Sequence, residues 1–174
     1  MRIAGPAFTV DCAGADNLWL HRAIYRANPG DVLVVAPHAG HEAGYWGDIL
    51  NEAAMQRGVA GLVIDGGVRG SAGLCDAALP IFSRSICIVG TGKDRKALAA
   101  LQSPVRIGDI IINSGDLIVG DADGVVVLPA AKAPAFVAAG LDREADEARK
   151  IEQIKAGART IDIYEFWGRL TAAG

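Results

Sequence analysis

The residues best suited to chemistry in this sequence are Asp48 and Arg69, together with the backbone amides of Ile49 and Leu50. The amides are expected at a helix start, where N–H groups have no partner within the helix, and an arginine offers paired donors. Both kinds of donor bind carboxylates. A keto acid suits them best, since its carboxylate and carbonyl oxygens all need donors. The alternative is a capped helix beside a surface arginine, with Arg69 paired to Asp65 or Asp48.

Two predicted elements would bring these residues together. A helix is expected over residues 48–57, with Asp48 as its N-cap. A buried strand over residues 61–64 follows it and ends in a Gly66-Gly67 turn before Arg69. The helix would be about 15 Å long and the strand about 20 Å. The helix start and the strand end should therefore meet at one edge.

Lys93 is a further candidate for binding an anion. It lies in the glycine-rich loop Gly90-Thr91-Gly92-Lys93, whose spacing is not that of a phosphate-binding P-loop. A solvated loop lysine explains the pattern equally well. The sequence also lacks a glycine fingerprint for a dinucleotide or for S-adenosylmethionine.

Carboxylates elsewhere in the sequence offer metal or acid–base chemistry. Asp48 could orient a water or the hydration shell of a divalent metal, and plain N-capping is its alternative. Glu144 and Glu147 lie one turn apart on a long predicted helix. They form either a solvated face with Arg143 and Lys150 as partners, or a carboxylate that reaches the site of a neighbouring subunit.

The histidines do not predict a metal site. His38 and His41 stand beside Glu42, but the surrounding glycines indicate a loop rather than a helix that could present them together. His21 is expected on a helix, solvated or partly packed. These residues carry no functional prediction of their own.

The composition is that of a core-forming protein of one domain, or of one domain with an arm. The chain has 174 residues, of which 51% are hydrophobic and 21% charged. Its net charge of −3 does not favour a nucleic-acid-binding surface. We expect no signal peptide, because Gly5-Pro6 interrupts the first residues, and no run of apolar residues is long enough to predict a membrane span. The three isolated cysteines are predicted to be free core thiols of a cytoplasmic protein.

The predicted elements alternate in the manner of an α/β fold with a largely parallel sheet. An edge strand opens the chain and a long helix nearly closes it. The expected elements are a strand over residues 3–11, a helix over 17–27 capped by Asp16, a strand over 32–36, a helix over 48–57, a strand over 61–64, a helix over 71–78, strands over 80–84, 85–89, 105–107, 110–112, 117–119 and 124–128, and a helix over 130–155. The apolar segment 161–167 after the long helix favours packing on a neighbouring subunit.

Several blocks, in this order along the whole chain, resemble the RraA-like family. They are residues 2–10, 29–35, 46–50, 57–69 and 121–129. The family includes the class II 4-hydroxy-4-methyl-2-oxoglutarate / 4-carboxy-4-hydroxy-2-oxoadipate aldolases and the RraA regulators of ribonuclease E. The resemblance implies an α/β, swivelling-domain-like β/β/α fold, with a domain over residues 1–130 and a C-terminal helical arm over 131–174. It also implies a homotrimer or homohexamer, in which the arm packs on a neighbouring subunit and the active sites lie between subunits.

The resemblance further implies roles for the residues above. Arg69 is similar to the family's substrate-binding arginine, and Lys93 to its active-site lysine. The amides of Ile49 and Leu50, next to Gly47, correspond to those that hold the pyruvyl carboxylate.

The implied metal chemistry is altered in this sequence. Family aldolases use Mg²⁺ or Mn²⁺, and Asp48 resembles the acid at the metal's water shell, with Glu144 or Glu147 entering from the adjacent subunit. The aldolases follow their arginine with a metal-binding aspartate and place another acid three residues later. This sequence has Gly70 and Gly73 at those positions. Loss of a metal Lewis acid removes several kcal/mol of transition-state stabilisation.

The leading prediction is a cytoplasmic, metal-dependent lyase. It would cleave 4-hydroxy-4-methyl-2-oxoglutarate-like substrates to pyruvate, decarboxylate oxaloacetate, or do both, without binding nucleic acid or membrane. The alternative, which Gly70 favours, is a non-catalytic RraA-like binding or regulatory protein of the ribonuclease-regulator type. Family members usually carry a helical segment before the point where this sequence begins, which predicts a short form or a start elsewhere in the gene.

Overall fold

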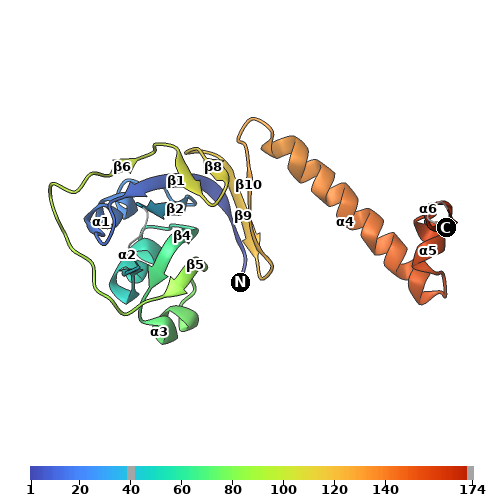
Figure 1. The fold of residues 1–174 in the computed structure, drawn as a ribbon, viewed down its shortest axis with the longest axis horizontal. Helices are drawn as coiled ribbons and strands as arrows, with labels where there is room; N and C mark the ends of the chain where they lie inside the picture. The colour runs from blue at the N-terminus through green and yellow to red at the C-terminus, as the bar shows by residue number, and fades with distance from the viewer. Residues whose placement is uncertain (39–41, 172–174) are drawn as a thin grey trace. The chain divides into compact units, whose positions relative to one another are not determined.

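The structure is a computed structural model that describes residues 1–38 and 42–171. The chain divides into two compact units, the first ending at residue 131 and the second beginning at residue 132. Figure 1 shows the elements along the chain. They are β1 (Ile3–Cys12), α1 (Leu18–Ile24), β2 (Val32–Pro37), β3 (Gly44–Trp46), α2 (Asp48–Gln56), β4 (Gly61–Val68), α3 (Ser71–Asp76), β5 (Ile81–Ile86), β6 (Ala100–Leu101), β7 (Val105–Ile107), β8 (Ile110–Ile112), β9 (Leu117–Asp121) and β10 (Gly124–Leu128), followed in the second unit by α4 (Ala133–Lys155), α5 (Thr160–Ile163) and α6 (Trp167–Thr171).

The first unit is built on a mixed sheet with the strand order β10-β9-β1-β2-β4-β3. The strands β1, β2, β4, β3 and β5 run parallel, whereas β9, β10 and β6 are antiparallel to their neighbours. The prediction of an N-terminal edge strand was wrong, because β1 has partners on both sides. Gly5 does not mark an edge: a Cβ there would lie 2.3 Å from the Gly30 carbonyl oxygen, so the glycine admits a neighbouring turn.

Both faces of the central strands are covered. On one face, Phe8, Leu33 and Leu62 pack with apolar residues of α1, α2 and α3. On the other, Val32 and Val34 pack with residues of β7, β8 and β9. Figure 1 shows the three helices on one side and β8 on the other. The all-apolar sequence of residues 32–36 fits a strand that is covered on both faces, since successive side chains point to opposite faces of the sheet.

The elements that carry the candidate site differ in detail from their prediction. The N-cap of α2 is Gly47, which has an extended backbone, so Asp48 is the first helical residue rather than the cap. Strand β4 continues to Val68, so Gly66 and Gly67 lie within it and form no turn. A Cβ at Gly67 would lie 2.7 Å from the Ala43 carbonyl oxygen. These glycines therefore allow the adjoining chain to approach closely.

Other predicted bounds also changed. A single strand, β5, replaces the two expected over residues 80–84 and 85–89, because it follows β4 in parallel with one shift of register. The short strands β3 and β6 were not predicted, since each is too brief to show a period. Helix α1 is shorter than expected at both ends. Asp16 still accepts a hydrogen bond from the Leu18 N–H (2.8 Å), although Asn17 is the capping residue.

The second unit consists of the long helix α4 and two short helices. Pro134 stands in the first turn of α4, where its missing N–H costs nothing, and Gly157 follows the helix with a φ of +97°. The helix begins at Ala133 rather than at residue 130. In the described part of the chain, no helix is both long and apolar enough to cross a membrane.

Candidate active site

One cavity of about 360 Å³ gathers the predicted site residues of the first unit. The start of α2, the end of β4, the start of α1 and the segment after β5 all contribute to it. Its lining residues are Asn17, His21, Tyr45, Gly47, Asp48, Ile49, Leu50, Arg69, Gly70, Ile88 and Lys93. The helix start and the strand end therefore meet, as their lengths predict. The roles of the individual residues stay predictions.

Unused backbone donors lie at the start of α2. No side chain caps this end of the helix, and the first amides of a helix have no acceptor within it. The amides of Ile49 and Leu50 belong to this group, and both residues line the cavity. The helix dipole adds partial positive charge at the same place. This wall is suited to a carboxylate.

The aliphatic stem of Arg69 lies close to Gly44 and Gly47. A Cβ at Gly47 would be 3.3 Å from the Arg69 Cγ atom, and one at Gly44 would be 3.1 Å from its Cβ atom. The backbone N–H of Arg69 donates to the Trp46 carbonyl oxygen at 2.9 Å, which fixes the start of the side chain. Glycine at these two positions leaves room for the arginine stem next to the α2 start.

The guanidinium of Arg69 forms no ion pair with any residue that the structure describes. Asp65, one predicted alternative partner, instead accepts a hydrogen bond from Arg84 Nε at 2.7 Å. Asp48, the other, forms no ion pair with Arg69. The alternative of a structural ion pair to either aspartate was therefore wrong. The cation at this wall is available to a ligand.

Asp48 fills the space next to Gly70 and Gly73. A Cβ at Gly70 would lie 2.8 Å from Asp48 Oδ2, and a Cβ at Gly73 would lie 2.7 Å from Oδ1. Gly70 also has a φ of +70°, in the left-handed region that favours glycine. The two glycines thus let the Asp48 carboxylate lie against the backbone at the start of α3.

The residues of this chain do not fit a directly held divalent metal ion. Mg²⁺ in proteins is bound by carboxylates and waters in octahedral geometry. Asp48 is the one carboxylate among the cavity-lining residues, and residues 1–38 and 42–171 contain no cluster of three histidine, cysteine, aspartate or glutamate side chains that could hold a metal.

Lys93 is positioned by the loop that carries it. The Gly92 N–H donates to the Ala15 carbonyl oxygen at 2.7 Å, and the Asp94 N–H donates to Asp16 Oδ2 at 2.5 Å. The N–H of Asn17 returns a bond to the Gly92 carbonyl oxygen at 3.3 Å. These bonds tie the loop to the start of α1. Lys93 itself forms no ion pair within the described residues.

The wall formed by α1 was missed at the level of sequence. Asn17 is buried, and its Nδ2 donates to the Tyr45 carbonyl oxygen at 2.8 Å, while its Oδ1 has no partner in the described part of the chain. His21 lies one turn further along the helix and also lines the cavity. Burial, followed by the charge of Lys93, lowers the pKa of His21 below 6.5. The available signal was that α1 follows β1, whose carboxyl end shares an edge with those of β2 and β4.

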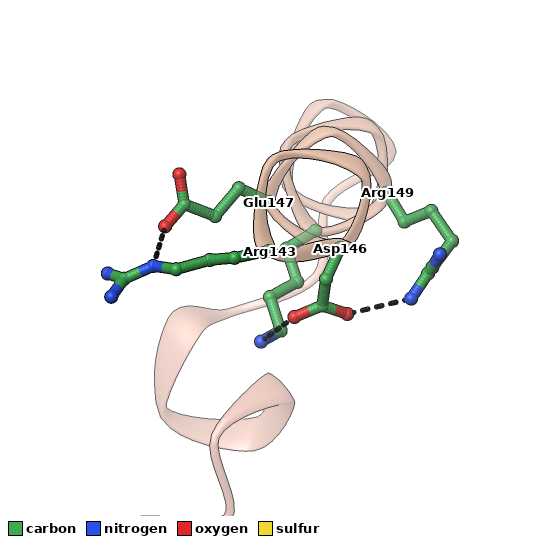
Figure 2. A network of polar contacts seen from close by, with 5 residues as sticks. Arg143, Asp146, Glu147 and Arg149 are labelled. Atoms are coloured by element: carbon green, nitrogen blue, oxygen red, sulfur yellow. Dashed lines mark hydrogen bonds and ion pairs between the residues drawn. The ribbon is translucent and has the colours of Figure 1, made fainter. Parts of the chain in front are cut away.

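Glu144 and Glu147 belong to α4, in the second unit. Figure 2 shows the polar contacts on this helix, where Arg143 Nε donates to Glu147 Oε1 at 2.8 Å and Arg149 donates to Asp146 at 2.9 Å. This matches the predicted solvated face for Glu147. Lys150 pairs with Asp146 at 2.5 Å, not with a glutamate. A single chain does not test entry of either glutamate into a neighbouring site.

Features outside the cavity offer less for this chemistry. A larger cavity of about 690 Å³ lies along β1, β9 and β10, but it holds none of the predicted site residues. Burial first, and then the charges of Asp16 and Asp11, raise the pKa of Cys12 to about 12. Cys75 is exposed, so the prediction that all three cysteines lie in the core was wrong. His38 pairs with Asp11 at 2.7 Å, and His41 lies outside the described residues.

The fold and the cavity define a small α/β protein with a cavity at the carboxyl edge of its parallel strands, lined by Arg69, Lys93 and the start of α2. Residues 1–127 match the model of the RraA-like family, described as Aldolase/RraA. The chain therefore belongs to the RraA-like family.

Relatives and solved structures agree with this assignment. A Halalkalibacterium halodurans protein named "Putative 4-hydroxy-4-methyl-2-oxoglutarate aldolase" is 33% identical over 163 residues, which is 94% of this chain and 77% of that one. An uncharacterized protein from Pseudomonas syringae pv. tomato is 30% identical, with a TM-score of 0.84 over 96% of this chain and 77% of that one. Streptomyces coelicolor RraAS2, described as an unusual member of the RNase ES inhibitor RraA protein family, is 29% identical, with a TM-score of 0.74 over 86% of this chain and 76% of that one.

Proposed function

We propose that this protein is a lyase acting on pyruvyl compounds. The reaction is aldol cleavage of 4-hydroxy-4-methyl-2-oxoglutarate-like substrates to pyruvate, decarboxylation of oxaloacetate, or both. The observation that carries the proposal is that Arg69, Lys93 and the free amides at the start of α2 line one cavity of about 360 Å³. The name of the Halalkalibacterium halodurans relative supports the same class.

Three sets of groups in this chain would bind the substrate. The amides of Ile49 and Leu50 hold the pyruvyl carboxylate at the positive end of the helix dipole. Arg69 donates to the carboxylate and to the adjacent carbonyl oxygen, which gains negative charge when the carbon–carbon bond breaks. Donors placed where charge develops lower the barrier, and each is worth about 10²–10³ in rate. Lys93 supplies a second cation for the remaining carboxylate of the substrate.

The proposal also includes a divalent metal ion and an assembly of several subunits. Dependence on Mg²⁺ or Mn²⁺ is proposed from the family, with Asp48 acting through water and with Glu144 or Glu147 of an adjacent subunit. A homotrimer or homohexamer in the cytoplasm, without nucleic-acid or membrane partners, is proposed alongside it. Large apolar side chains along α4, such as Phe136 and Leu141, are exposed in the single chain and support self-association.

A direct assay tests the proposal. Pyruvate release is measured from 4-hydroxy-4-methyl-2-oxoglutarate and from oxaloacetate, each with EDTA, Mg²⁺ or Mn²⁺. We expect turnover with at least one substrate, increased by metal. Rates equal to buffer under every condition would contradict the lyase assignment, whereas turnover in EDTA would contradict only the metal dependence.

The second candidate is a non-catalytic binding or regulatory protein of the same family. Gly70 favours it, because a carboxylate is missing where the family's aldolases bind metal. Replacing Gly70 with Asp should raise Mg²⁺-dependent pyruvate release by at least about tenfold, since a metal-bound group contributes several kcal/mol. It should also lower stability by at least about 1 kcal/mol, because the left-handed backbone penalises a side chain and a Cβ there would lie 2.8 Å from Asp48 Oδ2.

Gly70→Ala is the matched control for that substitution. It carries the same backbone strain and the same close approach to Asp48 without the added carboxylate, so it should lower stability and should not raise Mg²⁺-dependent pyruvate release above that of the wild type. Equal activity of the Asp and Ala variants would show that this position no longer controls catalysis.

A further inference from the structure

We propose that His21 is the proton-transfer residue of this site, acting as base and then as acid in cleavage of a 4-hydroxy-2-oxo acid. This inference rests on the proposed function. In the proposed function, Arg69, Lys93 and the amides at the start of α2 bind and polarise the substrate. None of these groups removes the proton of the substrate's hydroxyl group. Aldol cleavage needs a group that removes this proton and later supplies one to carbon.

The position of His21 is fixed by a buried anchor one turn earlier on α1. Asn17 is only 3% exposed, and it links the start of α1 both to the Tyr45 carbonyl oxygen and to the Gly92 carbonyl oxygen. Residues four apart on a helix lie on the same face. Asn17 and His21 accordingly line the same cavity, on a wall separate in sequence from Arg69 and from the α2 start.

The imidazole of His21 has no competing partner among the described residues. It makes no hydrogen bond and no ion pair within residues 1–38 and 42–171, and it is partly exposed. By contrast, His38 is occupied by Asp11. A ring that is uncommitted and lines the same cavity as Arg69 and Lys93 can reach a ligand held by them.

The charges around the ring favour its base form. Burial and then Lys93 lower its pKa, so the ring is neutral at pH 7. The other titratable or charged groups that line the cavity are Tyr45, Asp48 and Arg69. Two of the charged neighbours, Lys93 and Arg69, are cations and one, Asp48, is an anion. A neutral ring in these surroundings can accept a proton from a bound substrate.

The proposed cleavage needs no reactant other than the substrate and the ring of His21. A ring nitrogen of His21 accepts the proton of the C4 hydroxyl group. The C4–O bond becomes a carbonyl, the C3–C4 bond breaks, and its electron pair forms the enolate of pyruvate beside Arg69. The imidazolium then donates its proton to C3 of the enolate, which gives the methyl group of pyruvate and restores the neutral ring.

Decarboxylation of oxaloacetate has no hydroxyl proton to remove, because carbon dioxide leaves directly. The test therefore compares His21→Gln with wild type in three reactions, namely cleavage of 4-hydroxy-4-methyl-2-oxoglutarate, decarboxylation of oxaloacetate, and exchange of pyruvate methyl protons with D₂O. We expect cleavage and exchange to fall about 100-fold or more in kcat, with KM changed less than about threefold. Decarboxylation should fall by less than about tenfold, since water can protonate the released enolate.

His38→Gln is the matched control, because it removes a histidine outside the cavity. It should leave all three reactions unchanged. The acid limb of the kcat–pH profile for cleavage should be present in wild type and absent in His21→Gln. Melting temperature and circular dichroism show whether the variant folds, and His21→Asn provides a second substitution that keeps a polar side chain.

The outcomes separate the two proposals. Wild-type activity with an unchanged His21→Gln variant overturns the role of His21 alone. An equal loss in all three reactions, or a loss confined to KM, shows a positioning role and also overturns it. A wild-type protein inactive in all three reactions overturns the proposed function and this inference with it.

Discussion

The charged residues of α4 differ from those around the cavity in whether they have ionic partners. On α4, Arg143 pairs with Glu147 and Asp146 pairs with Arg149, each within a turn of the same helix (Figure 2). Around the cavity, Arg69 and Lys93 have no ionic partner in the described part of the chain. The α4 pairs are exposed, whereas the cavity brings together cations from distant parts of the sequence.

This difference indicates where binding free energy is available. An exposed pair between helical neighbours contributes little, because water and salt screen it. A cation held beside helix-start amides, with no ionic partner among the described residues, gains one when an anion binds. The comparison therefore predicts large functional effects at the cavity and small effects on stability from the ion pairs of α4.

The largest effect is expected at Arg69. Arg69→Met keeps the stem that lies over Gly47 and Gly44 but removes the guanidinium, and should lower kcat/KM by about 100-fold, since a charged hydrogen bond contributes about 1.5–3 kcal/mol. Steady-state pyruvate release measures it. Arg84→Met, at the arginine paired with Asp65, is the control and should retain activity. Similar losses in both variants would contradict the special role of the unpaired cation.

A smaller effect is expected at Lys93. Lys93→Met should lower kcat/KM about tenfold, because a lysine is a single point charge without the paired donors of arginine. Lys96→Met, three residues later and outside the cavity lining, is the matched control. If the Lys96 variant lost as much activity as the Lys93 variant, general charge rather than position would be responsible.

A smaller effect is expected on the pKa of His21, which depends on burial and on the charge of Lys93. An NMR titration should place it below 6.5 in wild type, and Lys93→Met should raise it only in part, because burial is the larger cause and remains. The folded ring then takes up its proton at a lower pH than the unfolded ring. Stability from this residue is therefore complete above about pH 6.5 and is lost as the pH falls through and below that value. A pKa at or above 6.5 in wild type would contradict the described packing.

The smallest effect is expected on α4. Glu147→Gln removes an exposed pair with Arg143 and should leave the melting temperature unchanged, as measured by differential scanning fluorimetry. The same variant and Glu144→Gln should be assayed for pyruvate release. A loss of turnover at unchanged melting temperature, in only one of the two, would identify the glutamate that enters a neighbouring site.

The sequence predicted the wall of the site that consists of consecutive elements. Residues 48–69 form one helix and one strand, and the closeness of Ile49, Leu50 and Arg69 follows from their lengths and direction. Local errors, such as the N-cap at Asp48, did not affect this conclusion. Lys93 was found through its glycine-rich loop, but not its attachment to residues 15–17.

By itself, the sequence determined the family, through the resemblance of its blocks. It also determined the alternation of elements and the closeness of the α2 start to Arg69, because periodicity and turn residues act over short distances along the chain. Only the tertiary structure decided that β1 is an interior strand, since pairing of residues 3–6 with β9 depends on contacts more than a hundred residues away. Only the tertiary structure brought His21 beside Lys93, because the edge that they share is made by parallel strands from separate parts of the chain. Likewise, the absence of ionic partners for Arg69 and Lys93 among the described residues is a property of packing, which composition does not reveal.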